Sequence, residues 1–176
     1  YERVVEVSER LNERGEVVTE LNEDEVRNSL IKAKSDGINS VAIAFMHSYI
    51  NPDHENKIEQ IAKEENFNQI SVSHKVSPLI KLVGRGDTTV VDAYLSPILR
   101  RYVNQVSEEL KDTKSTQLMF MQSNGGLTDA NLFQGKDALL SGPAGGVVSM
   151  TQTGKQAGFN RLIGFDMGGT LSLIHI

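Results

Sequence analysis

The sequence predicts an α/β protein, and three observations in its first half support this class. Residues 38–46 form a nearly uninterrupted apolar run rich in β-branched side chains, which is typical of a strand covered on both faces. Residues 70–74 are predicted to form a further strand. Helical patterns precede and separate the two strands, and a β-α-β-α-β order favours a largely parallel sheet.

Further short strands are predicted at residues 4–7, 17–19, 118–121 and 161–165. A turn at residues 12–15 separates the first two of these strands. Ser123-Asn124-Gly125-Gly126 follows the third and favours a turn with positive φ.

Two helices in the first half are predicted from their caps. Asn22 and Glu25 have the spacing of a capping box, and Gly37 stands where that first helix should end. Asn51-Pro52 begins the second, with Asn as the cap and Pro in the first turn. The inward-facing positions are Val26, Leu30 and Ala33 in the first helix, and Ile58, Ile61 and Ala62 in the second.

Two more helices are predicted in the second half. The longer spans residues 87–111, is capped by Asp87, and carries Tyr94 and Tyr102 on the apolar stripe that we expect to face the core. Pro97 should kink this helix or mark a fresh start capped by Ser96. The last helix is predicted to begin at Pro143 and to end at Gly158.

Composition narrows the function classes. With 18 basic and 23 acidic residues the net charge is −5, and no Lys/Arg cluster falls on a predicted face, which argues against nucleic acid or an anionic membrane as partner. The longest apolar stretch, residues 41–46, is too short to cross a bilayer. The absence of cysteine excludes disulfides, thiolate–zinc sites and a cysteine nucleophile within this segment. We expect a cytosolic protein whose sequence is cut at both ends.

The strongest local motif is Asp166-Met-Gly-Gly-Thr170, directly after a predicted strand. Two glycines at a strand end let the backbone approach an anion and direct N–H groups at it. Asp166 is placed to hold Mg²⁺ through water. A tight turn in which Asp166 bonds only to turn amides explains the motif equally well on its own.

Ser141-Gly-Pro-Ala-Gly-Gly-Val147 is the second motif. Pro at the first helical position leaves a bare helix N-terminus, which binds anions well. The alternative is a close-packed helix in which Gly145 and Gly146 admit a neighbouring backbone. Two such glycine-rich segments close together favour nucleotide binding, although neither a Walker A loop nor the Rossmann glycine spacing is present.

The histidines and Arg85 indicate a functional site less strongly than the two glycine-rich motifs do. One interpretation gives His47 and His54, beside Glu55, a metal-binding or acid–base role. The favoured interpretation is that a buried strand ends at His47 and that His54 and Glu55 lie in an exposed first helical turn. His74 has no predicted partner. A substrate-facing Arg85 is a further hypothesis.

Four passages resemble the hydantoinase A/oxoprolinase family and occur in the same order as there. They are residues 84–97 (GRGDTTVVDAYLSP), 120–127 (FMQSNGGL), 140–148 (LSGPAGGVV) and 163–170 (IGFDMGGT). The stretch from His47 to Glu55 and the opening Tyr-Glu-Arg-Val-Val-Glu-Val are similar as well, so the resemblance covers nearly the whole chain.

The resemblance implies part of an ATPase fold of the actin/Hsp70/sugar-kinase type, with parts of two α/β subdomains. It implies ATP-dependent opening of the lactam of 5-oxo-L-proline to L-glutamate, assisted by Mg²⁺ and K⁺, in glutathione metabolism. Asp166, Gly168, Gly169 and Thr170 would form a phosphate loop, with Asp166 toward the metal. Gly142, Gly145 and Gly146 would form a second element near the nucleotide. The catalytic residues stay unassigned, and the full-length protein is expected to be a homo-oligomer.

The chain also departs from the family pattern. The family continues Gly-Gly-Thr with Ser-Thr-Asp, whereas this chain continues Leu171-Ser-Leu-Ile-His-Ile176, which we interpret as an artefactual tail. Residues 1–76 are assigned to the end of the family's N-terminal region and residues 77–170 to the start of its ATPase region. We expect the segment alone to be inactive.

Two alternative functions stay open. The ATPase could serve a hydantoin or a ketone instead of 5-oxoproline, as it does in relatives. The chain could also belong to an actin-like nucleotide-binding protein that catalyses no ring opening.

Overall fold

The structure is a computed structural model that describes residues 2–110, 117–167 and 172–175. The chain divides into unit 1, Tyr1–Leu99, and unit 2, Arg100–Ile176. The long helix α4 (Leu82–Glu109) runs through this boundary. The boundary predicted between residues 76 and 77 concerns family regions and stays a prediction.

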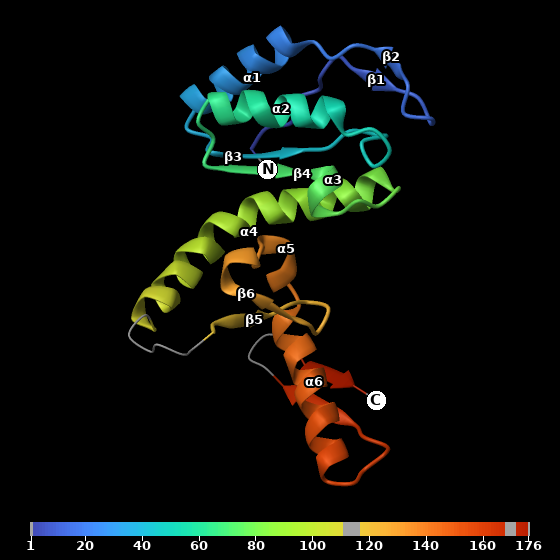
Figure 1. Ribbon diagram of the computed structural model, residues 1–176, viewed down its shortest axis with the longest axis vertical. Coiled ribbons are helices and arrows are strands. Elements are labelled where there is room, and N and C mark those ends of the chain that lie inside the picture. The colour runs from blue at the N-terminus through green and yellow to red at the C-terminus, as the bar shows by residue number, and fades with distance from the viewer. Residues whose placement is uncertain (1, 111–116, 168–171, 176) are drawn as a thin grey trace. The chain divides into compact units, whose positions relative to one another are not determined.

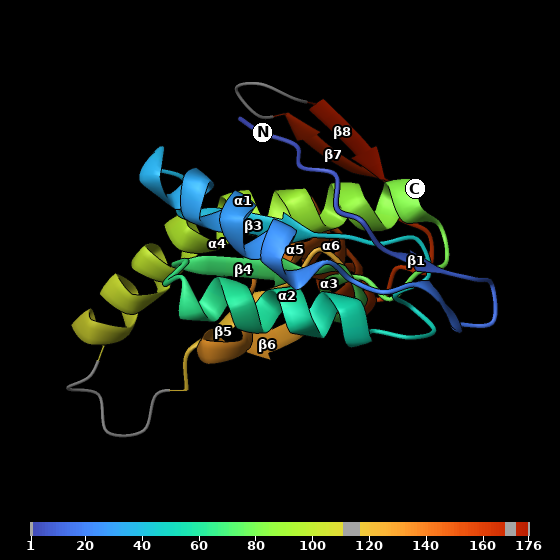
Figure 2. The ribbon, with the colours of Figure 1, turned by 90° about the horizontal axis from the view of Figure 1, so that it is seen from above.

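Unit 1 is built on two parallel strands, β3 (Ser40–Ile43) and β4 (Gln69–Val72), with Ser40 opposite Gln69 and Ile43 opposite Val72. The helix α2 (Asp53–Glu64) connects them. It lies beside α1 (Glu23–Ser35) on one face of the strands, and the first part of α4 lies on the other (Figures 1 and 2). The predicted alternation of strands and helices is therefore confirmed here, although β3–β4 is the one parallel pair among the described residues.

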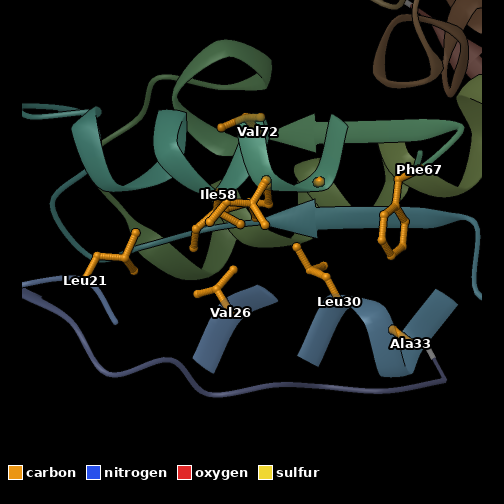
Figure 3. Packing of buried hydrophobic residues seen from close by; sticks show 10 residues of the cluster. Leu21, Val26, Leu30, Ala33, Ile58, Phe67 and Val72 are labelled. Carbon is orange, nitrogen blue, oxygen red and sulfur yellow. The ribbon is translucent and has the colours of Figure 1, made fainter. Parts of the chain in front are cut away.

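The hydrophobic core of unit 1 fills the space between α1, α2 and the two strands (Figure 3). The predicted inward positions of both helices are all buried, which confirms the periodicity. The buried members of this core are Leu21, Val26, Leu30, Ala33, Ile43, Ile58, Ile61, Ala62, Phe67 and Val72.

Both predicted runs are shorter as strands than expected. The first was predicted to extend to Met46, but β3 ends at Ile43 because the Phe45 N–H donates to the Glu55 carboxylate (2.9 Å) instead of a strand ladder. The second ends at Val72 and continues as the short helix α3 (Ser73–Val76).

The N-terminal hairpin is displaced from its predicted position. Strand β1 (Arg10–Leu11) pairs antiparallel with β2 (Val17–Thr19). The strand predicted at residues 4–7 is wrong, because no described strand lies beside these residues to complete its hydrogen bonds. The predicted turn before β2 is confirmed.

The face of the strands toward α4 is polar. Ile70 and Val72 pack with the core, whereas Ser71 alternates to the other face and donates to Asp92 of α4 (2.7 Å). Gln69 in turn donates to Ser71 (2.8 Å). Polar side chains therefore carry much of the contact between β4 and α4.

Helix α4 buries its polar side. Its buried residues in unit 1 are Arg85, Thr89, Asp92, Ala93 and Ser96. Tyr94 and Tyr102 are 71% and 56% exposed, so the prediction that they face the core is wrong for the described residues. Asp87 lies inside the helix, not at its cap, and Pro97 is accommodated within one continuous helix.

Unit 2 contains the last part of α4 and then an antiparallel hairpin of β5 (Met119–Met121) and β6 (Leu127–Asp129). The hairpin is followed by η1 (Ala130–Leu132) and α5 (Gly135–Ala138). Gly125 has φ 82° in the hairpin turn, which confirms the turn predicted there. The longer helix α6 (Ser141–Gln156) precedes β7 (Gly164–Met167), which pairs antiparallel with β8 (Ser172–His175). Strand β7 thus lies later than the predicted 161–165.

Candidate functional site

The first candidate region is the start of α6 in unit 2. Because α6 begins at Ser141, Gly142, Gly145 and Gly146 lie in its first two turns, and the prediction that a glycine-rich turn precedes a helix starting at Pro143 is wrong. The N-cap residue Leu140 offers no side-chain acceptor to the first amide groups of the helix. An uncapped helix N-terminus of this length is suited to an anion.

The glycines in the first half of α6 are not required by close packing among the described residues. A Cβ at Gly145 would lie 3.7 Å from the Met121 side chain, an ordinary contact, and a Cβ at Gly146 would meet nothing within 4 Å. The alternative in which these glycines admit a neighbouring backbone therefore finds no support in the described part of the chain.

The β5–β6 turn is tied to the start of α6 by Ser123. Its hydroxyl donates to the Asp137 carbonyl (2.7 Å) and accepts the Leu140 N–H (2.9 Å). The Ser123 N–H also donates to the Asp137 carbonyl (2.7 Å). The Ser-Asn-Gly-Gly segment therefore fixes where α6 begins.

Asp166, the predicted metal-binding residue, lies in β7 opposite Leu173, and its side chain is exposed. Gly168, Gly169 and Thr170 lie outside the described residues. No described group of three or more acidic or histidine side chains could hold a metal ion. A single exposed carboxylate fits Mg²⁺ that keeps most of its waters and is also held by a phosphate.

Helix α6 packs against β7 and against Leu162, which precedes β7, at two glycines. A Cβ at Gly154 would lie 2.3 Å from the Leu162 side chain, and a Cβ at Gly164 would lie 2.3 Å from the Met150 sulfur. These contacts lie in the second half of α6, whereas the candidate glycines lie in its first half. The structure thus places Gly142, Gly145 and Gly146 on α6 and Asp166 on β7, two elements that touch, without showing a direct contact between these residues.

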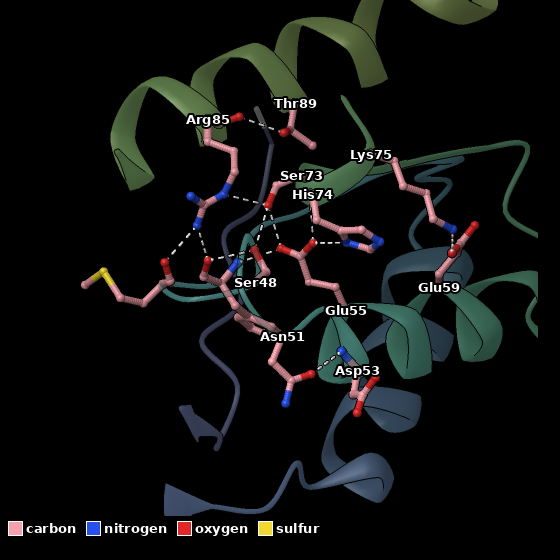
Figure 4. A network of polar contacts seen from close by, with 12 residues as sticks. Ser48, Asn51, Asp53, Glu55, Glu59, Ser73, His74, Lys75, Arg85 and Thr89 are labelled. Atoms are coloured by element: carbon pink, nitrogen blue, oxygen red, sulfur yellow. Dashed lines mark hydrogen bonds and ion pairs between the residues drawn. The ribbon is translucent and has the colours of Figure 1, made fainter. Parts of the chain in front are cut away.

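A second cluster, in unit 1, is more tightly built (Figure 4). Glu55 is fully buried, and its carboxylate accepts from Ser73 Oγ (2.6 Å) and from His74 Nδ1 (2.6 Å). The prediction that His54 and Glu55 occupy an exposed helical turn is wrong, because both lie at the start of α2 where it meets the ends of the strands. His54 Nδ1 is 2.8 Å from the Glu9 carboxylate.

Arg85 is also fully buried and faces no solvent, contrary to the hypothesis that it faces a substrate. Nε donates to Ser73 Oγ (2.9 Å), and the guanidinium lies 5.6 Å from the centre of the Tyr49 ring. The four remaining donors bond backbone carbonyls of Phe45, Met46, Leu79 and Ile80. All five guanidinium N–H groups are thereby used.

The cluster occupies the carboxyl ends of the parallel strands. The segment after β3 contributes Ser48, and the segment after β4 contributes Ser73 and His74. Ligands of open α/β sheets bind preferentially at this edge. His47 follows β3 without ending it, and its Nδ1 is buried with no hydrogen-bond partner among the described residues.

Comparison with known proteins decides the family. The family model described as hydantoinase/oxoprolinase matches residues 85–174, and the model of the hydantoinase/oxoprolinase N-terminal region matches residues 1–66. This chain belongs to the hydantoinase/oxoprolinase family. The resemblance noted in the sequence is thereby confirmed.

A 5-oxoprolinase from Saccharomyces cerevisiae is 46% identical to this family member over 155 residues, which cover 88% of the chain and 12% of that relative. The nucleotide-free structure of an acetone carboxylase described as ATP-dependent superposes with TM-score 0.85 at 25% identity. An ATP-dependent caprolactamase from Pseudomonas jessenii superposes with TM-score 0.84 at 28% identity. Each superposition covers 96% of the chain and 25% of the solved structure.

These likenesses confirm the fold-class prediction, part of an α/β ATPase fold of the actin/Hsp70/sugar-kinase type. The chain spans about an eighth of the yeast relative. In the described part of the chain, no helix is both long and apolar enough to cross a membrane.

Proposed function

We propose that this chain is part of an ATP-dependent hydrolase that opens the lactam ring of 5-oxo-L-proline to give L-glutamate. The observation that carries the proposal is the 46% identity to the yeast 5-oxoprolinase across 88% of the chain. A five-membered lactam resists hydrolysis, and transfer of a phosphoryl group from ATP to its oxygen would turn it into a good electrophile. The full-length protein is proposed to act in the cytoplasm, in glutathione metabolism, as a homo-oligomer.

The nucleotide site is proposed to use unit 2. Asp166, Gly168, Gly169 and Thr170 would bind the phosphates, with Mg²⁺ held through Asp166 and with K⁺ as a further cofactor. Gly142, Gly145 and Gly146 would present the amide groups at the start of α6. The uncapped N-terminus of α6 and the exposed carboxylate of Asp166 support this arrangement.

The superpositions on an acetone carboxylase and a caprolactamase support a second candidate, in which the same ATPase serves a ketone, a hydantoin or a larger lactam. A third candidate, a nucleotide-binding protein without ring-opening chemistry, predicts nucleotide binding without turnover of any of these compounds.

The test uses the full-length protein that carries this sequence. With Mg-ATP and 5-oxoproline we expect equal amounts of ADP and glutamate, and we expect slower turnover of hydantoin, caprolactam, and acetone with bicarbonate. Release of no glutamate from 5-oxoproline would refute the proposal, and the preferred compound of the panel would then name the substrate class.

The nucleotide site is tested in the same protein with Asp166→Asn. Removal of the carboxylate should raise the Mg-ATP concentration needed for half-maximal turnover, or abolish turnover, while Glu20→Gln on the exposed surface should not. Unchanged kinetics in Asp166→Asn would exclude Asp166 as the metal-binding residue.

A further inference from the structure

The carboxylate of Glu55 has a complete set of hydrogen-bond donors. One oxygen accepts the Phe45 N–H (2.9 Å) and the Ser73 hydroxyl (2.6 Å). The other accepts the His74 N–H (3.1 Å) and lies 2.6 Å from His74 Nδ1. An ionised carboxylate is an acceptor only, so Nδ1 of His74 must be the donor in this last contact.

That contact sets the tautomer of His74. When the ring is neutral and Nδ1 carries the hydrogen, Nε2 carries the free lone pair. Figure 4 shows Nε2 on the side of the ring that points away from Glu55. The side chain is 14% exposed, and the described residues supply no hydrogen-bond partner to Nε2.

The surroundings hold this arrangement rigidly. The Ser73 hydroxyl donates a hydrogen bond to Glu55 and accepts one from Arg85 Nε (2.9 Å). The carboxylate therefore cannot rotate without breaking bonds to two backbone N–H groups and to the Ser73 hydroxyl, which Arg85 holds in turn. A histidine held in one tautomer by a buried carboxylate is the arrangement that positions a general base in hydrolytic enzymes.

The other histidine–carboxylate pair described in unit 1 differs in the exposure of its histidine. His54 Nδ1 lies 2.8 Å from Glu9, but the His54 side chain is only 3% exposed. A histidine so enclosed offers little access to a substrate. His54 is therefore a matched reference for His74, since both pairs share the contact and differ in accessibility.

We propose that His74 is a catalytic acid–base residue of the lactam-opening reaction. This inference rests on the proposed function, and the position of His74 just beyond the carboxyl end of β4 supports it. As water attacks the activated carbonyl carbon and the O–C bond forms, one water proton passes to His74 Nε2. As the C–N bond breaks, the same proton passes to the ring nitrogen, and His74 returns to its starting state. This step leaves an acyl phosphate, from which a second water molecule releases inorganic phosphate to give glutamate.

The discriminating variant is His74→Asn in the full-length protein. The asparagine amide reproduces the Nδ1–H donor to Glu55 but has no basic lone pair where Nε2 stood. We expect kcat/KM for 5-oxoproline to fall by roughly 10²–10⁴-fold, the usual contribution of a general acid–base group, with an unchanged melting temperature. In His74→Ala, added imidazole should restore part of the activity, while imidazole should not stimulate His54→Asn.

Three outcomes are distinguishable. Loss of activity in His74→Asn together with imidazole rescue of His74→Ala supports the inference. Near-wild-type kcat/KM in His74→Asn, or absence of rescue, overturns it and leaves His74 as a structural partner of Glu55. Absence of glutamate formation by the wild-type protein refutes the proposed function itself, before any variant is compared.

Discussion

At the scale of single residues, Arg85 organises the ends of the two parallel strands. Its guanidinium bonds four backbone carbonyls and one hydroxyl, so it joins the segment after β3 to the segment before α4. No described carboxylate bonds the guanidinium directly. The Ser73 hydroxyl bridges Arg85 and Glu55, because it accepts from Arg85 Nε and donates to the Glu55 carboxylate. Only a planar side chain with five donors can make this set of bonds.

Arg85→Lys is therefore expected to destabilise unit 1 strongly. Lysine offers three donors from a single nitrogen, so at least two buried carbonyl or hydroxyl acceptors would lose their partner, at a cost of about 3 kcal/mol or more. Chemical denaturation followed by circular dichroism measures the loss. The exposed Arg14→Lys is the control, and equal stability of the two variants would contradict the role assigned to Arg85.

Glu59 of α2 forms an ion pair with Lys75 of α3. Partial burial alone would raise the pKa of Glu59, but hydrogen bonds from Lys75 and Lys63 outweigh it and lower that pKa below its ordinary value. A lowered pKa in the folded state stabilises the fold above the unfolded-state pKa of about 4.3. The contribution is lost as the pH falls through the folded-state pKa.

Glu59→Gln is accordingly expected to lower the free energy of unfolding near pH 7 by about 1 kcal/mol or less, because both lysines are half exposed. The difference from the wild type should vanish in acid, below the folded-state pKa of Glu59. Denaturation midpoints measured from pH 7 down to pH 3 test this. A difference that stays constant over the range would show that the ion pairs are not its cause.

At the scale of elements, α1 follows the rules that predicted it. Asn22 Oδ1 accepts the Glu25 N–H (3.1 Å). The Glu25 carboxylate lies 3.3 Å from the Ser8 N–H instead of bonding back to Asn22, so only half of the predicted capping box forms. The helix ends at its C-cap Asp36, immediately before Gly37, which has φ 86°.

Loss of this cap should have a measurable cost. Asn22→Ala is expected to destabilise unit 1 by about 1 kcal/mol, because the first turn of α1 loses its side-chain acceptor. Asn22→Asp retains an acceptor and should retain most of the stability. Thermal unfolding of the two variants decides the point; equal losses would indicate that the side-chain acceptor is not what stabilises the helix end.

Helix α4 shows why periodicity alone does not assign a buried face. Its sequence has two faces that could be buried, one apolar and one carrying Arg85, Thr89, Asp92 and Ser96. In unit 1 the polar face is the buried one, because β4 presents Ser71 and Gln69 to it. Alternating polar residues at positions 69, 71 and 73 were the one sequence signal of this polar contact.

At the scale of the whole molecule, the chain matches only a small part of its relatives' length. It spans 12% of the yeast relative and 25% of each solved structure. Val83, Tyr94 and Ile98 on α4 are exposed in this segment.

The amino-acid sequence by itself determined the family, the α/β class and the local elements that depend on neighbouring residues. Caps, turns with positive φ and the inward faces of α1 and α2 are set by interactions within a few positions of the chain. The order of the motifs identified the family, because this order can be seen in the sequence alone.

The tertiary structure decided what depends on partners distant in sequence. Glu55, His74 and Arg85 bond groups that lie up to 40 positions away in the sequence, so their burial and roles follow from the pairing of β3 with β4. The same long-range contacts end β3 early, bury the polar side of α4, and fix the tautomer of His74. Local patterns alone do not determine these outcomes, because the free energy of a buried polar group depends on whether the fold brings a partner to it.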